Sequence, residues 1–151
     1  MREVSVEEFQ TTKSMPPEVD GMGNPLRQMG CDGACTADGA AGCAWFDGTS
    51  HHQLKMKGRC TNNQAEYMGL VSLLQQLVNE KFDGRGLIMM DSQLVVSQMD
   101  GTYSVRNEGL KPYYLKAKQL TSLLDVDIMW VPRSHPIMGQ IDKLAKEAAR
   151  C

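Results

Sequence analysis

The sequence has no apolar run long enough to cross a membrane, and its first eight residues, MREVSVEE, lack the hydrophobic segment of a secretory signal. The first absence argues against a membrane-spanning helix in this sequence, and the second predicts a cytoplasmic protein. The 151 residues are enough for one domain whose core needs no disulfide or metal to hold it together.

The five cysteines include no C-x-x-C pair. In an intracellular protein this pattern predicts free thiols. A zinc site from Cys60 with His51 and His52 fits no common ligand spacing and is disfavoured. A single disulfide, either Cys31–Cys35 or one through the C-terminal cysteine, stays open as an alternative.

A large excess of either charge is also missing. The formal net charge is −2, which excludes a broadly basic coat for nonspecific nucleic-acid binding but leaves room for a local basic track. The acidic excess belongs to residues 1–30, which hold five acids and three bases, whereas residues 31–151 hold thirteen of each. The body of the chain is therefore neutral.

The chain divides into two parts by composition. Residues 1–26 contain Pro16-Pro17, Pro25 and two glycines without sustained periodicity, which predicts a flexible extension. A short strand over Val4–Val6 is an alternative. Residues 27–151 are predicted to form the folded domain.

Periodicity and turn signals predict the elements of this domain. Three strands come first, and strands then alternate with helices, which predicts a mixed sheet with helices packed on it. The predicted strands are 31–35, 39–48, 51–58, 86–90 and 126–131, and the predicted helices are 62–81, 92–99, 111–124 and 139–150.

Four acids occupy positions next to the predicted core. Asp32 lies in a strand of small residues, and Glu66 lies on the apolar stripe of a helix. Asp91 ends a buried strand, and Asp142 flanks the stripe of the last helix. None has an obvious ion-pair partner nearby in the sequence. Buried carboxylates that share one pocket repel each other unless divalent cations neutralise them, and oxygen ligands suit Mg²⁺ or Mn²⁺ rather than zinc.

The motifs that carry these acids resemble type 1 ribonuclease H. They are Asp32-Gly33, the run TNNQAE over residues 61–66, DSQLV over 91–95 and DKLA over 142–145, in that order. The resemblance covers about residues 27–150 and is to the variants that lack the basic protrusion between helices. It implies the α/β ribonuclease H-like fold, a five-stranded mixed sheet with helices packed on both faces.

The resemblance also implies a function, which is endonucleolytic cleavage of the RNA strand of RNA–DNA hybrids to leave 5′-phosphate and 3′-hydroxyl ends. Two Mg²⁺ or Mn²⁺ ions would be held by Asp32, Glu66, Asp91 and Asp142, with Asp32 between them. Gly33, Asn62, Asn63 and Gln93 would bind the substrate, because neutral amides can donate to and accept from hydroxyls and base edges. The hybrid is the expected partner of a monomeric protein that binds no membrane.

Three features leave alternatives open. His135 stands in the loop where some family members carry a histidine that moves protons, and it is either such a shuttle or an ordinary loop residue. Met138 and Ile141 replace the Asn and Ala that the family often has, which leaves a catalytically weak or inactive nucleic-acid-binding module as an alternative. A nuclease for duplex RNA or DNA is another. Candidate phosphate contacts are Lys55, Lys57, Arg59, Arg106, Lys111, Lys116 and Lys118.

Overall fold

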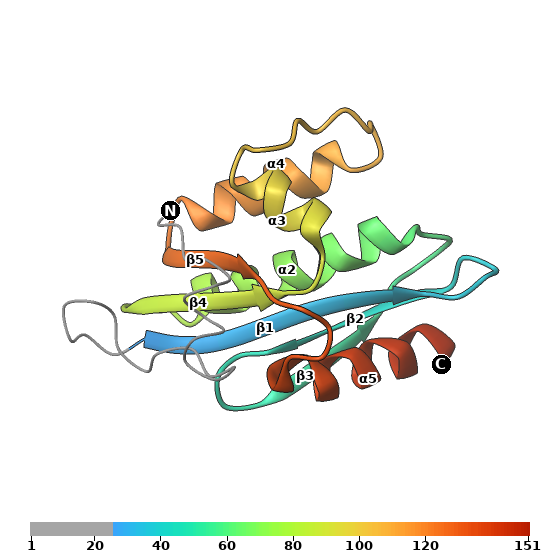
Figure 1. The fold of residues 1–151 in the computed structure, drawn as a ribbon, viewed down its shortest axis with the longest axis horizontal. Coiled ribbons are helices and arrows are strands. Elements are labelled where there is room, and N and C mark those ends of the chain that lie inside the picture. Colours follow the sequence, from blue (N-terminus) through green and yellow to red (C-terminus); the bar gives the residue numbers. More distant parts are fainter. Residues whose placement is uncertain (1–25) are drawn as a thin grey trace.

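The computed structural model describes residues 26–151 (Figure 1). A five-stranded sheet runs in the order β3-β2-β1-β4-β5. The pairs β1–β2 and β2–β3 are antiparallel, whereas β1–β4 and β4–β5 are parallel. The elements are β1 (Leu26–Cys35), β2 (Ala41–Phe46), β3 (His51–Lys55), α2 (Asn62–Asn79), β4 (Arg85–Met90), α3 (Gln93–Met99), α4 (Lys111–Thr121), β5 (Asp125–Trp130) and α5 (Pro136–Arg150).

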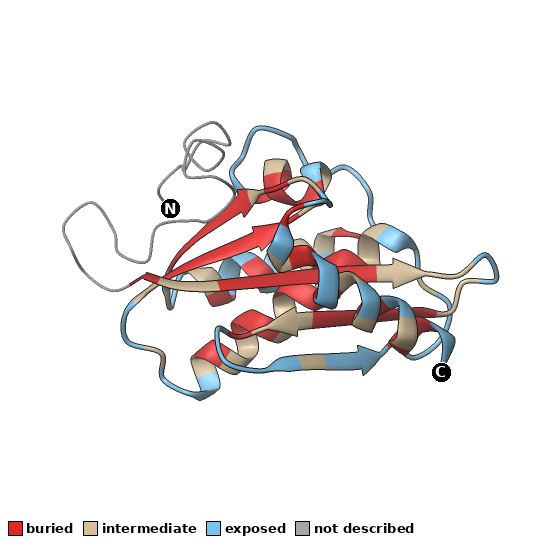
Figure 2. Ribbon diagram, turned by 60° about the horizontal axis from the view of Figure 1, so that its bottom comes forward, coloured by how far each residue is buried: buried red, intermediate tan, exposed pale blue. Residues whose placement is uncertain are grey.

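Helices cover both faces of this sheet, as predicted. α2, α3 and α4 lie on one face, and α5 lies on the other against β1 and β2 (Figure 1). The larger core lies on the α2 side, with Leu70, Leu74 and Ile88 fully buried there. Along β3 the residues are mostly exposed, which marks it as the uncovered edge (Figure 2).

Several element boundaries differ from the sequence prediction. β2, β3, α2 and α4 are each a few residues shorter than predicted, whereas β1 and α5 begin earlier. β1 begins at Leu26 rather than at residue 31, because Leu26–Gly30 pairs in parallel with Arg85–Met89 of β4. The hydrogen bonds of that ladder outweigh the polar Gln28 and the glycine that make the segment look irregular in sequence. α5 begins at Pro136 rather than at residue 139, since the proline takes the first helical position.

The predicted extension and the alternative strand Val4–Val6 lie outside the described residues, apart from Leu26. All five cysteines are free, which confirms the predicted thiols. In residues 26–151, no cluster of three metal-ligating side chains includes Cys60, His51 or His52. Over the same range, no helix combines the length and apolarity needed to cross a bilayer.

Candidate active site

Close backbone contact between β1 and α2 brings the first two acids together. A Cβ atom built on Gly33 would lie 2.1 Å from the carbonyl carbon of Ala65, and one built on Gly69 would lie 2.6 Å from the carbonyl oxygen of Asp32. Only residues without a side chain allow two backbones to approach so closely. α2 therefore lies directly on β1, and Glu66 faces Asp32.

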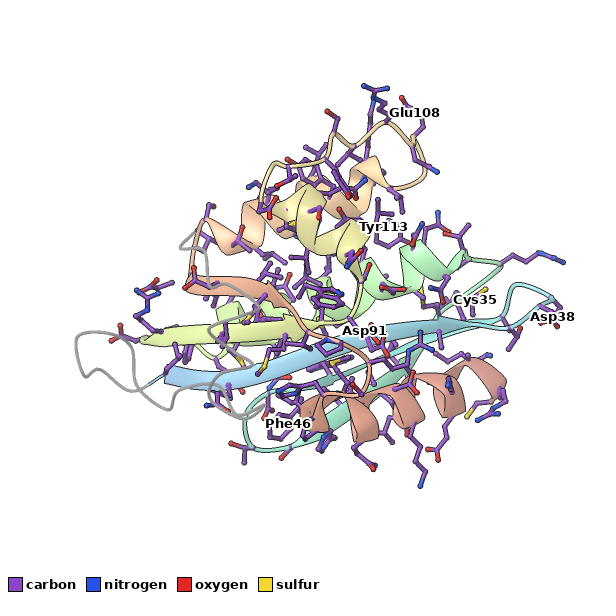
Figure 3. All side chains as sticks on the ribbon, viewed as in Figure 1. Cys35, Asp38, Phe46, Asp91, Glu108 and Tyr113 are labelled. Carbon is purple, nitrogen blue, oxygen red and sulfur yellow. The ribbon has the colours of Figure 1, made fainter. Side chains whose placement is uncertain are left out.

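Asp91 completes the cluster from the end of β4. One carboxylate oxygen from each of Asp32, Glu66 and Asp91 lies within 4.8 Å of the others. Asp91 directly follows β4 (Figure 3). Its carbonyl oxygen accepts a 3.1 Å hydrogen bond from Nε1 of Trp130 at the end of β5. Because β1 and β4 are parallel neighbours, their acids meet on one side of the sheet, where ligands collect in α/β folds.

Two members of the cluster, Asp32 and Glu66, are buried, and each has a raised pKa. Asp32 is 4% exposed and Glu66 is 8% exposed. Burial, followed by the charges of Asp91 and Glu66, raises the pKa of Asp32 to about 8. Burial is also the main cause that raises the pKa of Glu66, and Asp91 adds to it. Three carboxylates in this position call for a cation.

The two oxygens of Glu66 differ in their surroundings. Oε1 accepts a 2.6 Å hydrogen bond from Nδ2 of Asn62, one turn earlier in α2. Oε2 is buried and, among the described residues, meets no donor in hydrogen-bonding geometry, although the Ser92 hydroxyl is close enough to favour the charged form. Oε2 of Glu66 is therefore available to a ligand inside the cluster.

Asp142, the fourth predicted acid, is near the cluster but outside the 4.8 Å group. Its charge adds to the pKa rise of Asp32, which places it close by. Its Oδ2 lies 3.1 Å from Nζ of Lys146, one turn later in α5. The prediction that no acid has a partner nearby in sequence is therefore wrong for Asp142, because an i,i+4 pair is available.

Arg133 is the residue that sequence reasoning missed. Its Nε lies 3.4 Å from Oδ2 of Asp91, and its side chain is 75% exposed. Charges of Asp91, Asp142 and Asp32 raise the pKa of Arg133. The signal in the sequence was its position, because the loop after β5 must open on the same side of the sheet as Asp91, the residue after β4.

His135 has a structural task in this fold. It is the N-cap of α5, with Nδ1 accepting a 3.1 Å hydrogen bond from the Ile137 N–H. Its side chain is 5% exposed. A buried cap that accepts through Nδ1 supports the second interpretation of His135, a loop residue that holds the fold rather than one that carries protons.

The predicted substrate residues surround the cluster unevenly. Asn62 and Gln93 are exposed, and Asn63 is half-buried, at the starts of α2 and α3. Gly33 is buried beneath α2, and its N–H donates to Oδ1 of Asp32 at 2.9 Å. The amides thus stand at the starts of two helices, and Gly33 has a packing position.

Comparison with known proteins places this arrangement among its relatives. No protein-family model matches the chain. The chain is 38% identical over 92 residues to the bifunctional protein Rv2228c of Mycobacterium tuberculosis, a match of 60% of this chain and 24% of that protein. The chain thus spans about a quarter of the length of the first curated relatives that it matches.

Solved structures match over most of the chain. RNase H1 from the archaeon Halobacterium salinarum superposes with a TM-score of 0.73 and 31% identity, covering 83% of this chain and 98% of that one. The structure of LC11-RNase H1 in complex with an RNA/DNA hybrid superposes with a TM-score of 0.71 and 27% identity, covering 82% of this chain and 96% of that one.

Proposed function

The chain belongs to the type 1 ribonuclease H family, and from that premise we propose that it is a divalent-metal-dependent endonuclease that cleaves the RNA strand of RNA–DNA hybrids. The observation that carries the proposal is the convergence of Asp32, Glu66 and Asp91 within 4.8 Å at a buried position. The hybrid bound to LC11-RNase H1 supports the choice of substrate.

The residues present fit divalent cations. All candidate ligands are carboxylate oxygens, which favour Mg²⁺ or Mn²⁺. Such an ion would stabilise the charged form of buried Asp32, which the neighbouring carboxylates disfavour. It would also give a partner to Oε2 of Glu66, which meets no donor in hydrogen-bonding geometry among the described residues. Asp32, Glu66 and Asp91 would hold the ions with help from Asp142. When bound, the two ions supply an activated water and stabilise the leaving 3′ oxygen.

The chain's own side chains would position the substrate around this centre. Asn62 holds the carboxylate of Glu66 in place through its 2.6 Å hydrogen bond to Oε1. Asn63 and Gln93, at the starts of α2 and α3, would contact the minor groove. Arg133 is exposed and next to Asp91, so its guanidinium would bind the phosphate of the cleaved strand.

The departures that suggest an inactive binding module have a packing explanation. Met138 and Ile141 are both fully buried in the layer between α5 and the sheet. Ile141 fills the space beside Gly30, where a Cβ atom would lie 2.8 Å from its Cδ1. Their apolar character therefore follows from the packing of α5 and carries no argument against turnover.

The test is cleavage of end-labelled substrates in Mg²⁺ or Mn²⁺, with RNA–DNA hybrid, duplex RNA and duplex DNA compared in one assay. We expect cleavage of the hybrid alone, with 5′-phosphate and 3′-hydroxyl ends, and none with EDTA. Binding of the hybrid without cleavage in either ion would establish the binding module instead. Equal cleavage of duplex RNA or DNA would establish the other nuclease.

The first mutational prediction concerns Asp91. Asp91→Asn removes one charged ligand from the cluster while keeping its shape, so cleavage should fall by a factor of at least about 10³, as expected when a charge-stabilising group is lost. Binding of the hybrid, measured by fluorescence anisotropy, should change by less than about threefold, a difference below 1 kcal/mol. Full activity in this variant would remove Asp91 from the proposed centre.

A further inference from the structure

Two half-buried thiols lie next to the proposed substrate surface. Cys35 is the last residue of β1, and Cys60 comes directly before Thr61, the N-cap of α2. Sγ of Cys35 donates a 3.0 Å hydrogen bond to the carbonyl oxygen of Cys60. Sγ of Cys60 lies 3.8 Å from the carbonyl oxygen of Lys57. The two cysteines are thus direct neighbours, although twenty-five positions separate them in sequence.

The backbones that carry these thiols are fixed side by side. The Met56 N–H donates to the carbonyl oxygen of Ala41, and the Cys60 N–H donates to that of Gly39, both at 2.9 Å. Figure 3 shows Cys35 at the end of the molecule where β1 runs into its turn. Both thiols also pack on one small apolar cluster, made of Ala41, Met56 and Ala65. The thiol of Cys35 therefore already contacts the backbone of Cys60.

The other three cysteines have different surroundings. Cys31 and Cys43 are fully buried, and burial raises the pKa of Cys43 to about 12 and that of Cys31 well above its usual value. Thiols of this kind are poor nucleophiles. Cys151 is exposed at the C-terminal end of α5, where its Sγ donates to the Glu147 carbonyl oxygen. The chain therefore provides two inert thiols and one accessible single thiol for comparison.

We propose that Cys35 and Cys60 form an oxidation-sensitive dithiol, which hydroperoxides convert into a disulfide that weakens binding of the hybrid. One thiolate attacks the peroxide, becomes a sulfenic acid and releases the first water. The second thiol then displaces the hydroxyl from the sulfenic sulfur, which forms the S–S bond and releases the second water. Two thiols are oxidised and one hydrogen peroxide is reduced.

The effect on binding rests on the proposed function, and it follows from what Cys60 holds. To form the bond, both sulfurs must leave their carbonyl partners, and Cys60 must move toward β1. Thr61, Asn62 and Asn63 follow it directly and would move with it, while Asp32 and Gly33 stay in the strand. A displacement of about 1 Å at a positioning residue can cost about 10²-fold in rate. It would also misalign the amides that are proposed to contact the hybrid, which weakens binding.

The experiment uses the full chain carrying Cys151→Ser, so that no disulfide can form between molecules through that residue. The protein is treated with hydrogen peroxide and digested without reductant. We expect a mass lower by two hydrogens and a peptide joining Cys35 to Cys60, reversed by dithiothreitol. We expect the Kd for a hybrid, measured in Ca²⁺ to prevent cleavage, to rise by on the order of tenfold.

Two serine variants in the same background are the controls. Cys35→Ser and Cys60→Ser should each prevent the crosslink and keep the Kd of the reduced protein after peroxide treatment. Oxygen added to either cysteine without a crosslink, or a crosslink through Cys31 or Cys43, would overturn the proposed dithiol. A crosslink that leaves the Kd unchanged would overturn its effect on binding. If the reduced protein bound no hybrid, the proposed function would fail. The mass measurement would still show whether Cys35 and Cys60 form a disulfide.

Discussion

A proton on Asp32 and a divalent cation beside it are alternative ways to relieve the same repulsion. Among the described residues, the strongest electrostatic effect on this carboxyl after burial comes from Asp91, which lies in the same 4.8 Å group. The folded protein without metal should therefore hold a proton on Asp32 at a pH where the unfolded chain does not. Stability of the metal-free protein then depends on pH in a direction opposite to that of an ordinary salt-bridged acid.

The stability of the metal-free protein should fall as pH rises above 4. The pKa of Asp32 is about 8 in the folded state against 3.8 ordinarily, so the folded state binds more protons between these values and its stability falls as pH rises. The free energy of unfolding in EDTA should drop by on the order of 4 kcal/mol from pH 4 to pH 8. Urea titrations at several pH values measure it.

Two comparisons make this pH prediction specific. Asp32→Asn should flatten the profile, because the group that titrates is gone. Saturating Mg²⁺ should raise stability most at pH 8, since the ion then binds the ionised carboxylate without displacing a proton. A metal-free profile that rises between pH 4 and pH 8 would show that Asp32 is already charged and paired.

Arg133 is the second residue whose effect can be isolated. Its guanidinium lies beside Asp91 and repels any cation bound there. Because the side chain is exposed, the pair contributes no more than about 1 kcal/mol, so Arg133→Ala should tighten Ca²⁺ binding by up to about fivefold in calorimetry. The same variant should weaken hybrid binding, since a phosphate contact is lost. Arg133→Lys keeps the charge and should leave Ca²⁺ affinity unchanged; equal tightening in both variants would contradict the argument.

Single residues also show where sequence reasoning stops. The acids Asp32, Glu66 and Asp91 could be predicted to converge, because each stands at a position whose burial follows from local pattern. The cap formed by His135 could not, since it depends on the turn after β5, in which the His135 N–H donates to the Pro132 carbonyl oxygen. Arg133 was missed because an exposed loop cation has no local signature until the opposite loop is placed.

At the scale of elements, the site depends on how closely α2 lies on β1. Gly33→Ala would place a Cβ atom 2.1 Å from the Ala65 carbonyl carbon, so α2 must move and Glu66 must move with it. We expect a loss of roughly 2–3 kcal/mol in the free energy of unfolding, as in other overpacked contacts. Cleavage should fall by about 10²-fold in the protein that remains folded.

Gly139 provides the matched control for this glycine. It lies within α5, and a Cβ atom there would meet nothing within 4 Å. Gly139→Ala should therefore stabilise the protein by roughly 0.5–1 kcal/mol through helix propensity alone, with cleavage unchanged. Chemical denaturation of the two variants in parallel measures both effects. If Gly33→Ala and Gly139→Ala changed the free energy of unfolding by a similar amount in the same direction, the close β1–α2 contact would not be what holds the site together.

Elements with local signals were predicted well, and elements fixed by distant partners were not. The start of α2 follows from its capping box, in which Thr61 accepts from the Gln64 N–H at 3.1 Å and the Gln64 side chain accepts from the Thr61 N–H at 2.9 Å. The first half of β1 has no such signal, because its ladder to β4 joins residues almost sixty positions apart. Strand pairing of this kind is set by the whole sheet.

At the scale of the whole molecule, a neutral body must still hold a polyanion. Three of the seven candidate cations are already engaged within the protein: Lys55 donates to the Ala149 carbonyl, Lys118 to that of Met99, and Lys111 pairs with Glu108. Lys57 and Arg59 are exposed in the segment that leads into α2, a few residues before Asn62 and Asn63. The structure thus favours a short basic track at this end over a broad surface.

Salt dependence of binding tests this track. In an Asp91→Asn background, which prevents cleavage, Lys57→Ala and Arg59→Ala should each lower the slope of log K against log salt by about 1, because one phosphate contact releases about one counterion. The loss should be the same for hybrids of different sequence, since phosphate contacts carry no base information. Lys81→Gln, beyond the other end of α2, should leave the slope unchanged. An equal loss of slope in all three variants would contradict the local track, because it would mean that the net charge of the whole molecule controls binding. Residues 31–151 have no net charge, so a local track is the expected source of phosphate contacts.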